Sequence, residues 1–168
     1  MSKSRNEIAE NLKWRLTDIF KDQKEFDDLL DDISKKADIS PYEGKLSDKK
    51  TLLKCLKEMD EIETVLEKLD VYAYMKKDLD ARDSESNALL TRVENVIIKY
   101  SSSASFLTPE ITSLPEETLK EIIADPDFSD YDYMLSTLLK SKKHVLSKES
   151  ENILAMGGQV FGGFHDIF

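Results

Sequence analysis

Apolar residues recur every three or four positions along most of this chain, which is the spacing of an amphipathic α-helix. The first such stretch spans residues 21–39, and its opposite face is almost entirely charged. The apolar positions on its one face are Phe26, Leu29, Leu30, Ile33 and Ala37. Ser40-Pro41 follows, and proline disfavours the helical conformation for the residue before it, so we expect the helix to end there.

A second apolar series is much longer and runs from Leu52 to Met75 at the same spacing. No glycine or proline interrupts residues 47–104, but Asp80, Asp83 and Ser84 favour helix caps over helix interiors. We therefore place a turn within residues 78–86. The pattern predicts a helix of about 30 residues, ~45 Å long, paired with an antiparallel helix. Ser47 or Asp48 is the expected N-cap of the first.

The second half of the chain predicts shorter helices. Thr108-Pro109 and Leu114-Pro115 are typical helix starts, with Thr108 as the N-cap of the first. Asp125-Pro126 ends a helix, an amphipathic stretch runs from Tyr131 to the lysines near 140, and Ser147 opens a last helix. We interpret the serine-rich residues 101–105 as helix rather than linker, because small residues permit close approach.

Strand-like alternation of useful length is absent from the sequence, and no internal repeat is visible. The predicted fold is all-α, an antiparallel helical array built around a long helical hairpin (about residues 48–104) with shorter helices following. Its 168 residues predict one domain.

Both ends of the chain carry bulky apolar residues. Within residues 1–20, the expected packing segment, these are Trp14, Leu16, Ile19 and Phe20. Residues 157–168, GGQVFGGFHDIF, form an apolar segment that looks made to pack against polypeptide beyond it. Two alternatives stay open for the first segment, since it could pack on this domain's own core or on a further lobe.

Composition narrows the possible partners. The net charge is −10 and the lysines alternate with acids, which argues against nucleic acid or an anionic membrane as the main partner. Cys55 is the single cysteine, so no internal disulfide can form and a reducing compartment is expected. No signal-peptide core or membrane-length apolar run occurs, and we expect a cytoplasmic location.

The residues offer little chemistry. Only two histidines are present, His144 and His165, and neither lies in an HExxH helix or another zinc-binding spacing. Asp28, Asp31 and Asp32 are interpreted as a solvated face, and Cys55 as a buried structural thiol. No glycine-rich phosphate loop and no nucleophile–base arrangement is recognisable. We therefore predict no catalytic, cofactor-binding or metal-binding residue in this sequence.

Five segments, taken together and in order, resemble the start of oligoendopeptidase F, in the thimet-oligopeptidase-like zinc metallopeptidase family. They are KWRLTDIF (13–20), YEGKL (42–46), DVYAYMKKDLDARDSESNALLTRV (70–93), SFLTPEITSLPEETLKEII (105–123) and LSKESENILAMGGQVF (146–161). The resemblance implies an all-α, bowl-like peptidase with a channel between two lobes that admits oligopeptides and excludes folded proteins.

In such enzymes zinc is held by an HExxH helix and a later glutamate, all of which lie downstream of the resembling region. The resemblance therefore assigns residues 1–168 to a non-catalytic N-terminal lobe that walls the substrate channel and limits substrate size. Its expected partners are the downstream catalytic lobe of the same polypeptide and, in the intact enzyme, oligopeptides. Zinc is expected in the full-length enzyme and no cofactor in this chain, which should be inactive alone. The alternative is a standalone helical interaction or scaffold domain, and an independent hydrolase is disfavoured.

Overall fold

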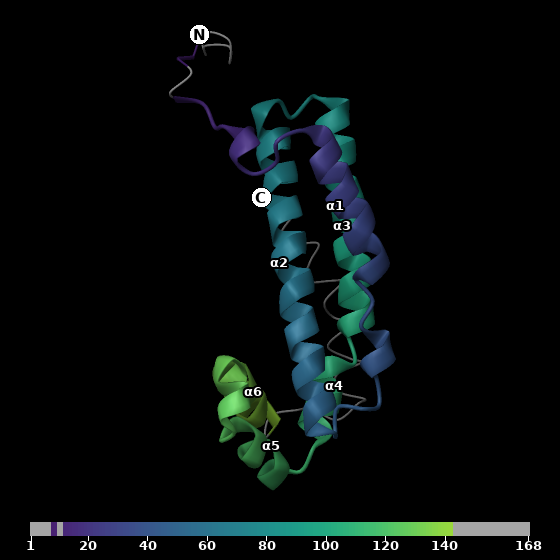
Figure 1. The fold of residues 1–168 in the computed structure, drawn as a ribbon, viewed down its shortest axis with the longest axis vertical. Helices are drawn as coiled ribbons and strands as arrows, with labels where there is room; N and C mark the ends of the chain where they lie inside the picture. The colour runs from purple at the N-terminus through teal and green to yellow at the C-terminus, as the bar shows by residue number, and fades with distance from the viewer. Residues whose placement is uncertain (1–7, 10–11, 143–168) are drawn as a thin grey trace, which may run out of the picture. The chain divides into compact units, whose positions relative to one another are not determined.

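A computed structural model describes residues 8–9 and 12–142 (Figure 1). All the helices named below lie within these residues. The elements, in chain order, are η3 (Leu16–Asp18), α1 (Gln23–Lys36), η4 (Ser40–Tyr42), α2 (Lys49–Leu79), α3 (Ser84–Ala104), α4 (Leu107–Ser113), α5 (Glu116–Ile123), η5 (Pro126–Tyr131) and α6 (Asp132–Ser141). No strand occurs within these ranges. The all-α prediction is confirmed.

The chain divides into two compact units, residues 1–110 and residues 111–168. The first unit contains η3, α1, η4, α2, α3 and the start of α4, and the second contains the elements that follow. Each unit is described by itself below.

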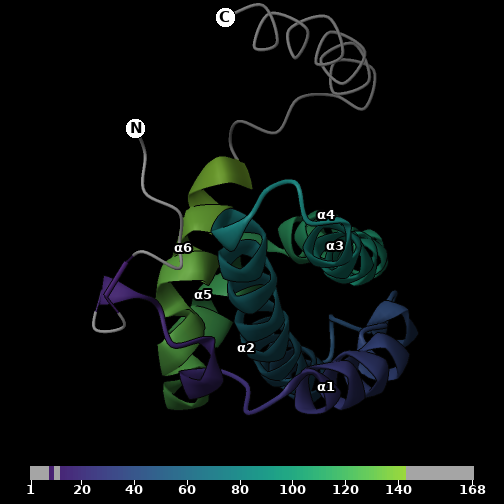
Figure 2. The ribbon, with the colours of Figure 1, turned by 90° about the horizontal axis from the view of Figure 1, so that it is seen from above.

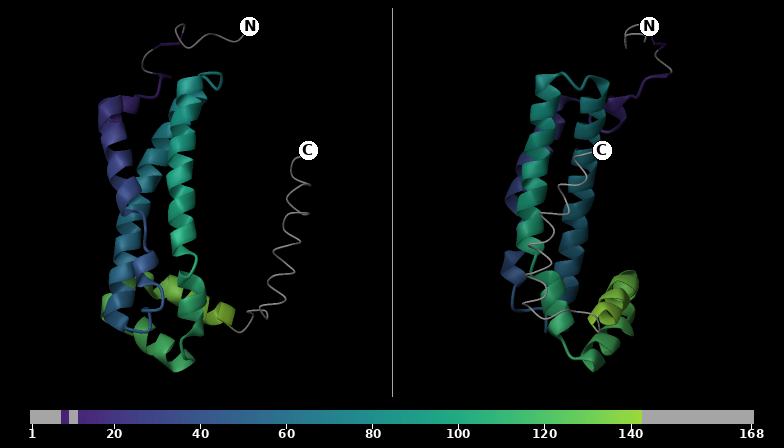
Figure 3. Two further views of the ribbon diagram at one scale, coloured as in Figure 1. Left: turned by 90° about the vertical axis from the view of Figure 1, so that its right-hand side faces the viewer. Right: turned by 180° about the vertical axis from the view of Figure 1, so that it is seen from behind.

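The hairpin of α2 and α3 forms the larger part of the first unit, and its two helices run side by side in opposite directions (Figure 3). The Asp48 carboxylate accepts a hydrogen bond from the Thr51 backbone N–H at 2.9 Å and so caps α2. Asp83 caps α3 in the same way, accepting from the Ser86 N–H at 3.0 Å. The predicted hairpin and its turn are confirmed, with Asp48 rather than Ser47 as the first cap.

Helix α1 lies against α2, as the view along the hairpin shows (Figure 2). Its apolar face is buried through Phe26, Leu30 and Ile33. Polar contacts join this part of the chain to α3. The Arg92 guanidinium pairs with Asp27 of α1 at 2.8 Å, and the N–H of Ile39, which follows α1, donates to the Ser103 hydroxyl at 3.2 Å. The serine-rich residues 101–104 belong to α3, as expected, and Ser103 uses its small side chain in this contact.

Phe20 anchors the N-terminal segment to the first unit. Its ring meets Phe26 and Tyr72 edge-on, with centroids 5.3 Å and 5.0 Å apart, and only 1% of the residue is exposed. The Lys68 ammonium lies 4.3 Å from the same ring centroid. Trp14, by contrast, is 53% exposed. In this segment, packing on the domain's own core therefore depends on Phe20 and not on the tryptophan.

The second unit has a small apolar core made by Leu119, Ile122, Phe128 and Leu135. Helix α5 starts directly after Pro115, as predicted. The prediction that Thr108 is the N-cap of α4 is wrong, because α4 begins at Leu107 and the Phe106 carbonyl accepts from the Glu110 N–H at 2.9 Å. Pro109 is tolerated inside this first turn, where a backbone N–H would have no partner in the helix.

Several predictions fall outside the described residues. These are the helix opening at Ser147, the apolar segment 157–168, and the surroundings of His144 and His165. Among the helices that are described, none has the length and apolar character needed to cross a lipid bilayer.

We expect Phe20→Ala to destabilise the first unit by about 3–5 kcal/mol, because it removes a fully buried ring from an aromatic cluster. Urea unfolding followed by far-ultraviolet circular dichroism measures the change. The matched control is Trp14→Ala, which should change the unfolding free energy by less than about 1 kcal/mol, since about half of that residue is already exposed to water. Equal losses in the two variants would contradict the anchoring role of Phe20.

Candidate functional site

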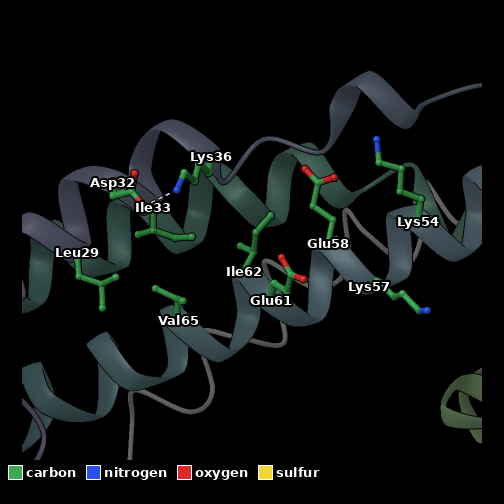
Figure 4. A pocket seen from close by; sticks show the side chains of 10 residues that line it. All are labelled: Leu29, Asp32, Ile33, Lys36, Lys54, Lys57, Glu58, Glu61, Ile62 and Val65. Atoms are coloured by element: carbon green, nitrogen blue, oxygen red, sulfur yellow. Dashed lines mark hydrogen bonds and ion pairs between the residues drawn. The ribbon is translucent and has the colours of Figure 1, made fainter.

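A groove of about 440 Å³ lies between α1 and α2 of the first unit (Figure 4). Its middle is apolar, with Leu29 and Ile33 from α1 facing Ile62 and Val65 from α2. Ile33 and Ile62 are buried, whereas the other two are half-buried. The groove therefore offers an apolar floor a few side chains long.

Charged side chains form the rim of this groove, and several of them are already engaged. Lys36 pairs with Asp32 at 2.6 Å across one helical turn. The Tyr42 hydroxyl donates to the Glu58 carboxylate, and this bond, together with burial, raises the pKa of Tyr42 to about 12. Tyr42 therefore stays a neutral donor at neutral pH. No nucleophile lies beside a base here, so the groove is suited to contact and not to covalent chemistry.

The described residues do not fit a zinc ion. Asp28 pairs with Lys24, and Asp32 with Lys36, as expected for a solvated face. Asp31 lies 4.0 Å from the Arg92 guanidinium that also pairs with Asp27. Within residues 8–9 and 12–142, no group of three or more His, Cys, Asp or Glu side chains could hold a metal. Cys55 is buried, and burial with the nearby charges of Glu58 and Glu110 raises its thiol pKa to about 11. A protonated thiol is a poor metal ligand and a poor nucleophile, which confirms the prediction of a buried cysteine.

One carboxylate that the sequence analysis did not single out joins two distant segments. The Glu110 oxygens accept hydrogen bonds from the backbone N–H groups of Gly44, at 2.8 Å, and Leu46, at 2.7 Å. Gly44 adopts a φ of +76°, a left-handed conformation that favours glycine. The turn in YEGKL thus presents two N–H groups to α4, which begins in SFLTPEITSLPEE. Gly44 was the feature of the sequence that indicated a turn here, but no nearby residue indicated that Glu110 would bind it.

Two carboxylates lie at the same level of the hairpin, since the bond between Glu63 and Tyr100 sets the register of its antiparallel helices. Asp70 on α2 and Glu94 on α3 are both half-buried, and neither makes a hydrogen bond or ion pair with the residues that the structure describes. Burial raises the pKa of Asp70 above its ordinary value, and the charge of Glu94 raises it further. The remaining contact on this side is the Tyr100 hydroxyl, which donates to Glu63 at 2.7 Å.

Comparison with known proteins places this arrangement in a family. A family model described as Oligopeptidase F matches residues 110–168. An oligoendopeptidase F homolog from Lactococcus lactis is 34% identical over 100% of this chain, and the oligopeptidase PepF of Bacillus subtilis is 31% identical over 98% of it. The chain belongs to the oligoendopeptidase F family.

Solved structures agree with this assignment. Oligoendopeptidase F from Enterococcus faecium superposes with a TM-score of 0.65 over 83% of this chain at 26% identity. A crystal structure of a peptidase from Chlamydophila abortus has a TM-score of 0.81 over 94% of the chain at 24% identity, which shows a shared fold.

The chain spans only part of these oligoendopeptidase F proteins. It covers 29% of the Lactococcus relative and 25% of the Bacillus one, and corresponds to their N-terminal region. The family match begins at residue 110, the point at which the first compact unit ends.

We expect Glu110→Gln to destabilise the first unit by about 1–3 kcal/mol. The amide keeps one acceptor but turns an N–H donor toward a backbone N–H donor, and hydrogen bonds to a charged acceptor are the stronger kind. Chemical denaturation measures the loss. Glu43→Gln, a change at an exposed position beside the same turn, should leave the denaturation midpoint unchanged. An equal shift in both variants would contradict the role assigned to Glu110.

We expect Asp70→Asn to raise the melting temperature at pH 7. Folding penalises the charged form of Asp70, so its carboxylate costs stability above its folded pKa, and that cost fades as the pH falls and the group becomes protonated in both states. The difference between variant and wild type should therefore shrink toward zero below pH 3.8, the ordinary pKa. Melting curves across this range test the sign, and a variant that is less stable at pH 7 would refute it.

Proposed function

We propose that this chain is the non-catalytic N-terminal lobe of a zinc-dependent oligopeptidase, and that it walls the substrate channel and limits substrate size. The observation that carries the proposal is similarity along the full chain to oligoendopeptidase F proteins about three to four times its length. In this proposal the remaining polypeptide supplies catalysis, and oligopeptides are the substrates.

The rigidity of the first unit supports a role as a wall. A size filter has to keep its shape, and α2 is held along its length by the Phe20 cluster near its C-terminal end, by α3, and by the Tyr42–Glu58 bond nearer its start. With 31 residues, α2 is about 45 Å long, which matches about a dozen residues of extended peptide.

We assign the zinc to the remaining polypeptide. The donor sets among the described residues do not fit a metal, and no catalytic step is derived for them. Zinc, where it is bound, would polarise the attacking water and the scissile carbonyl. This chain's contribution would be exclusion and orientation of the peptide.

We also propose a cytoplasmic location. The single cysteine is a buried free thiol, which suits a reducing compartment.

A chimera tests the proposed function. Residues 1–168 would replace the matching region of the Lactococcus relative, and cleavage of a short peptide would be compared with cleavage of a long unstructured protein such as casein. We expect the chimera to cleave the peptide at a rate at least tenfold above casein, and the 168-residue chain alone to cleave neither.

The controls are the intact relative and the relative without its matching region. If the isolated chain bound one zinc per molecule and cleaved peptides, or if the chimera cleaved casein as fast as the short peptide, the proposed function would be wrong. The interaction-domain alternative predicts an inactive chimera together with a folded, stable isolated chain.

A further inference from the structure

The α2–α3 hairpin has one side covered by α1 and an opposite side that α1 cannot reach. On α2, the Tyr72 ring packs on Phe26 with centroids 5.1 Å apart, and Lys76 donates to the Gln23 side chain at 2.6 Å. Tyr74 lies two residues from each of them, about half a turn around the helix at ~100° per residue. It therefore belongs to the opposite side.

The same geometry holds on α3. Arg92 points to α1, where it pairs with Asp27. Glu94 lies two residues further on, again about half a turn away. The bond between Tyr100 and Glu63 sets the antiparallel register, which brings Glu94 level with Asp70 of α2, and the charge of Glu94 raises the pKa of that carboxyl. Asp70 and Glu94 thus lie on the open side of the hairpin, away from α1.

The two sides differ in charge complementarity. On the side covered by α1, both cations have a partner that accepts a hydrogen bond: Arg92 pairs with Asp27, and Lys76 donates to Gln23. The open side instead sets two half-buried carboxylates against each other, with no partner among the residues described. A like-charge pair of this kind lowers stability unless a cation is supplied from elsewhere.

An exposed apolar side chain follows each of these carboxylates by one helical turn. Tyr74 comes four residues after Asp70 and is 45% exposed, and Ile98 comes four residues after Glu94 and is 62% exposed. Val71, next to Asp70, is 44% exposed. Lys77 adds one cation to this side, since its ammonium lies 5.6 Å from the Tyr74 ring centroid, but it forms no ion pair with Asp70 or Glu94. The open side therefore combines two carboxylates that no described cation pairs with and large apolar groups, the composition of a surface that binds a basic and apolar segment.

We propose that this open side, defined by Asp70, Val71, Tyr74, Glu94 and Ile98, is the docking surface for a basic segment of the remaining oligoendopeptidase F polypeptide. A Lys or Arg of that segment lies between Asp70 and Glu94, and its apolar side chains cover Tyr74 and Ile98. The inference rests on the proposed function, since a lobe that spans 29% of a relative needs a surface against the rest. Its negative charge disfavours a nucleic acid or an anionic membrane as the occupant.

Binding to synthetic peptides tests the docking surface directly. The probes are overlapping 15-residue peptides that cover the part of the Lactococcus relative not matched by this chain, measured against the immobilised 168-residue protein. We expect binding by a few peptides that combine Lys or Arg with apolar residues. The double variant Asp70→Asn/Glu94→Gln should bind them at least fivefold more weakly, and 0.5 M salt should weaken wild-type binding.

The matched control, Glu85→Gln/Glu43→Gln, also removes two negative charges from exposed positions of the first unit. Glu85 lies nine residues before Glu94, about 180° around α3, so the affinities of this variant should stay within twofold of wild type. Thermal melts accompany every variant. The double variant should be at least as stable as wild type, since it relieves a like-charge contact, so weaker binding cannot come from unfolding.

Three results would overturn the proposal: no peptide binding above scrambled sequences, equal loss in both double variants, or unchanged binding after Asp70→Asn/Glu94→Gln. The last outcome is separable from failure of the proposed function. If the chimera carrying the double variant keeps full peptide cleavage and size selection, the lobe assignment stands and only the docking surface is wrong.

Discussion

Burial of α2 on several sides is the constraint on which the first unit depends. A helix of 31 residues with apolar positions from Leu52 to Ala73 cannot hide them against a single neighbour. Helix α3 covers one side, α1 another, and the short η3 and η4 elements touch it as well. Most helical stability in proteins comes from such packing rather than from propensity. The surrounding elements are therefore arranged around α2, and their polar contacts refine a position that apolar packing already sets.

The hydrogen bonds that refine this position are few and specific. Asp48 and Asp83 cap the hairpin helices through their own first turns, so their effect is local. Glu110 acts at long range, since it satisfies two N–H groups of a turn that lies more than sixty residues earlier. Hydrogen bonds to a charged acceptor are stronger than those between neutral groups, and one carboxylate here accepts two. That contact links the end of the first unit to its first interhelical turn.

The sequence was sufficient for features that depend on nearby residues. The hairpin and the helix start at Pro115 follow from caps, from proline and from the spacing of apolar positions, all of which act within one or two turns. Features set by tertiary packing were not predictable in this way. Trp14 and Phe20 look alike as bulky residues near the N-terminus, yet only Phe20 meets Phe26 and Tyr72. The start of α4 was missed because Phe106 follows α3 so closely that the new helix opens before Thr108.

The same distinction between local features and features set by tertiary packing applies to the candidate site. The prediction of no catalytic or metal-binding residue rests on the sequence alone, because zinc and nucleophile sites have local spacings. Recognition of the family came from several weak segments in order, since no single one carries chemistry. The proximity of Asp70 and Glu94 depends on the register of two antiparallel helices, which one sequence does not supply.

The length of the hairpin is itself constrained by this packing. One residue inserted into the middle of α2 would rotate its second half by about 100° and carry Tyr72 away from Phe26 and Phe20. An insertion of seven residues, close to two full turns, would nearly restore the facing side, provided that α3 lengthened equally. Homologous hairpins should therefore differ in length by such paired steps, in increments of about 10 Å.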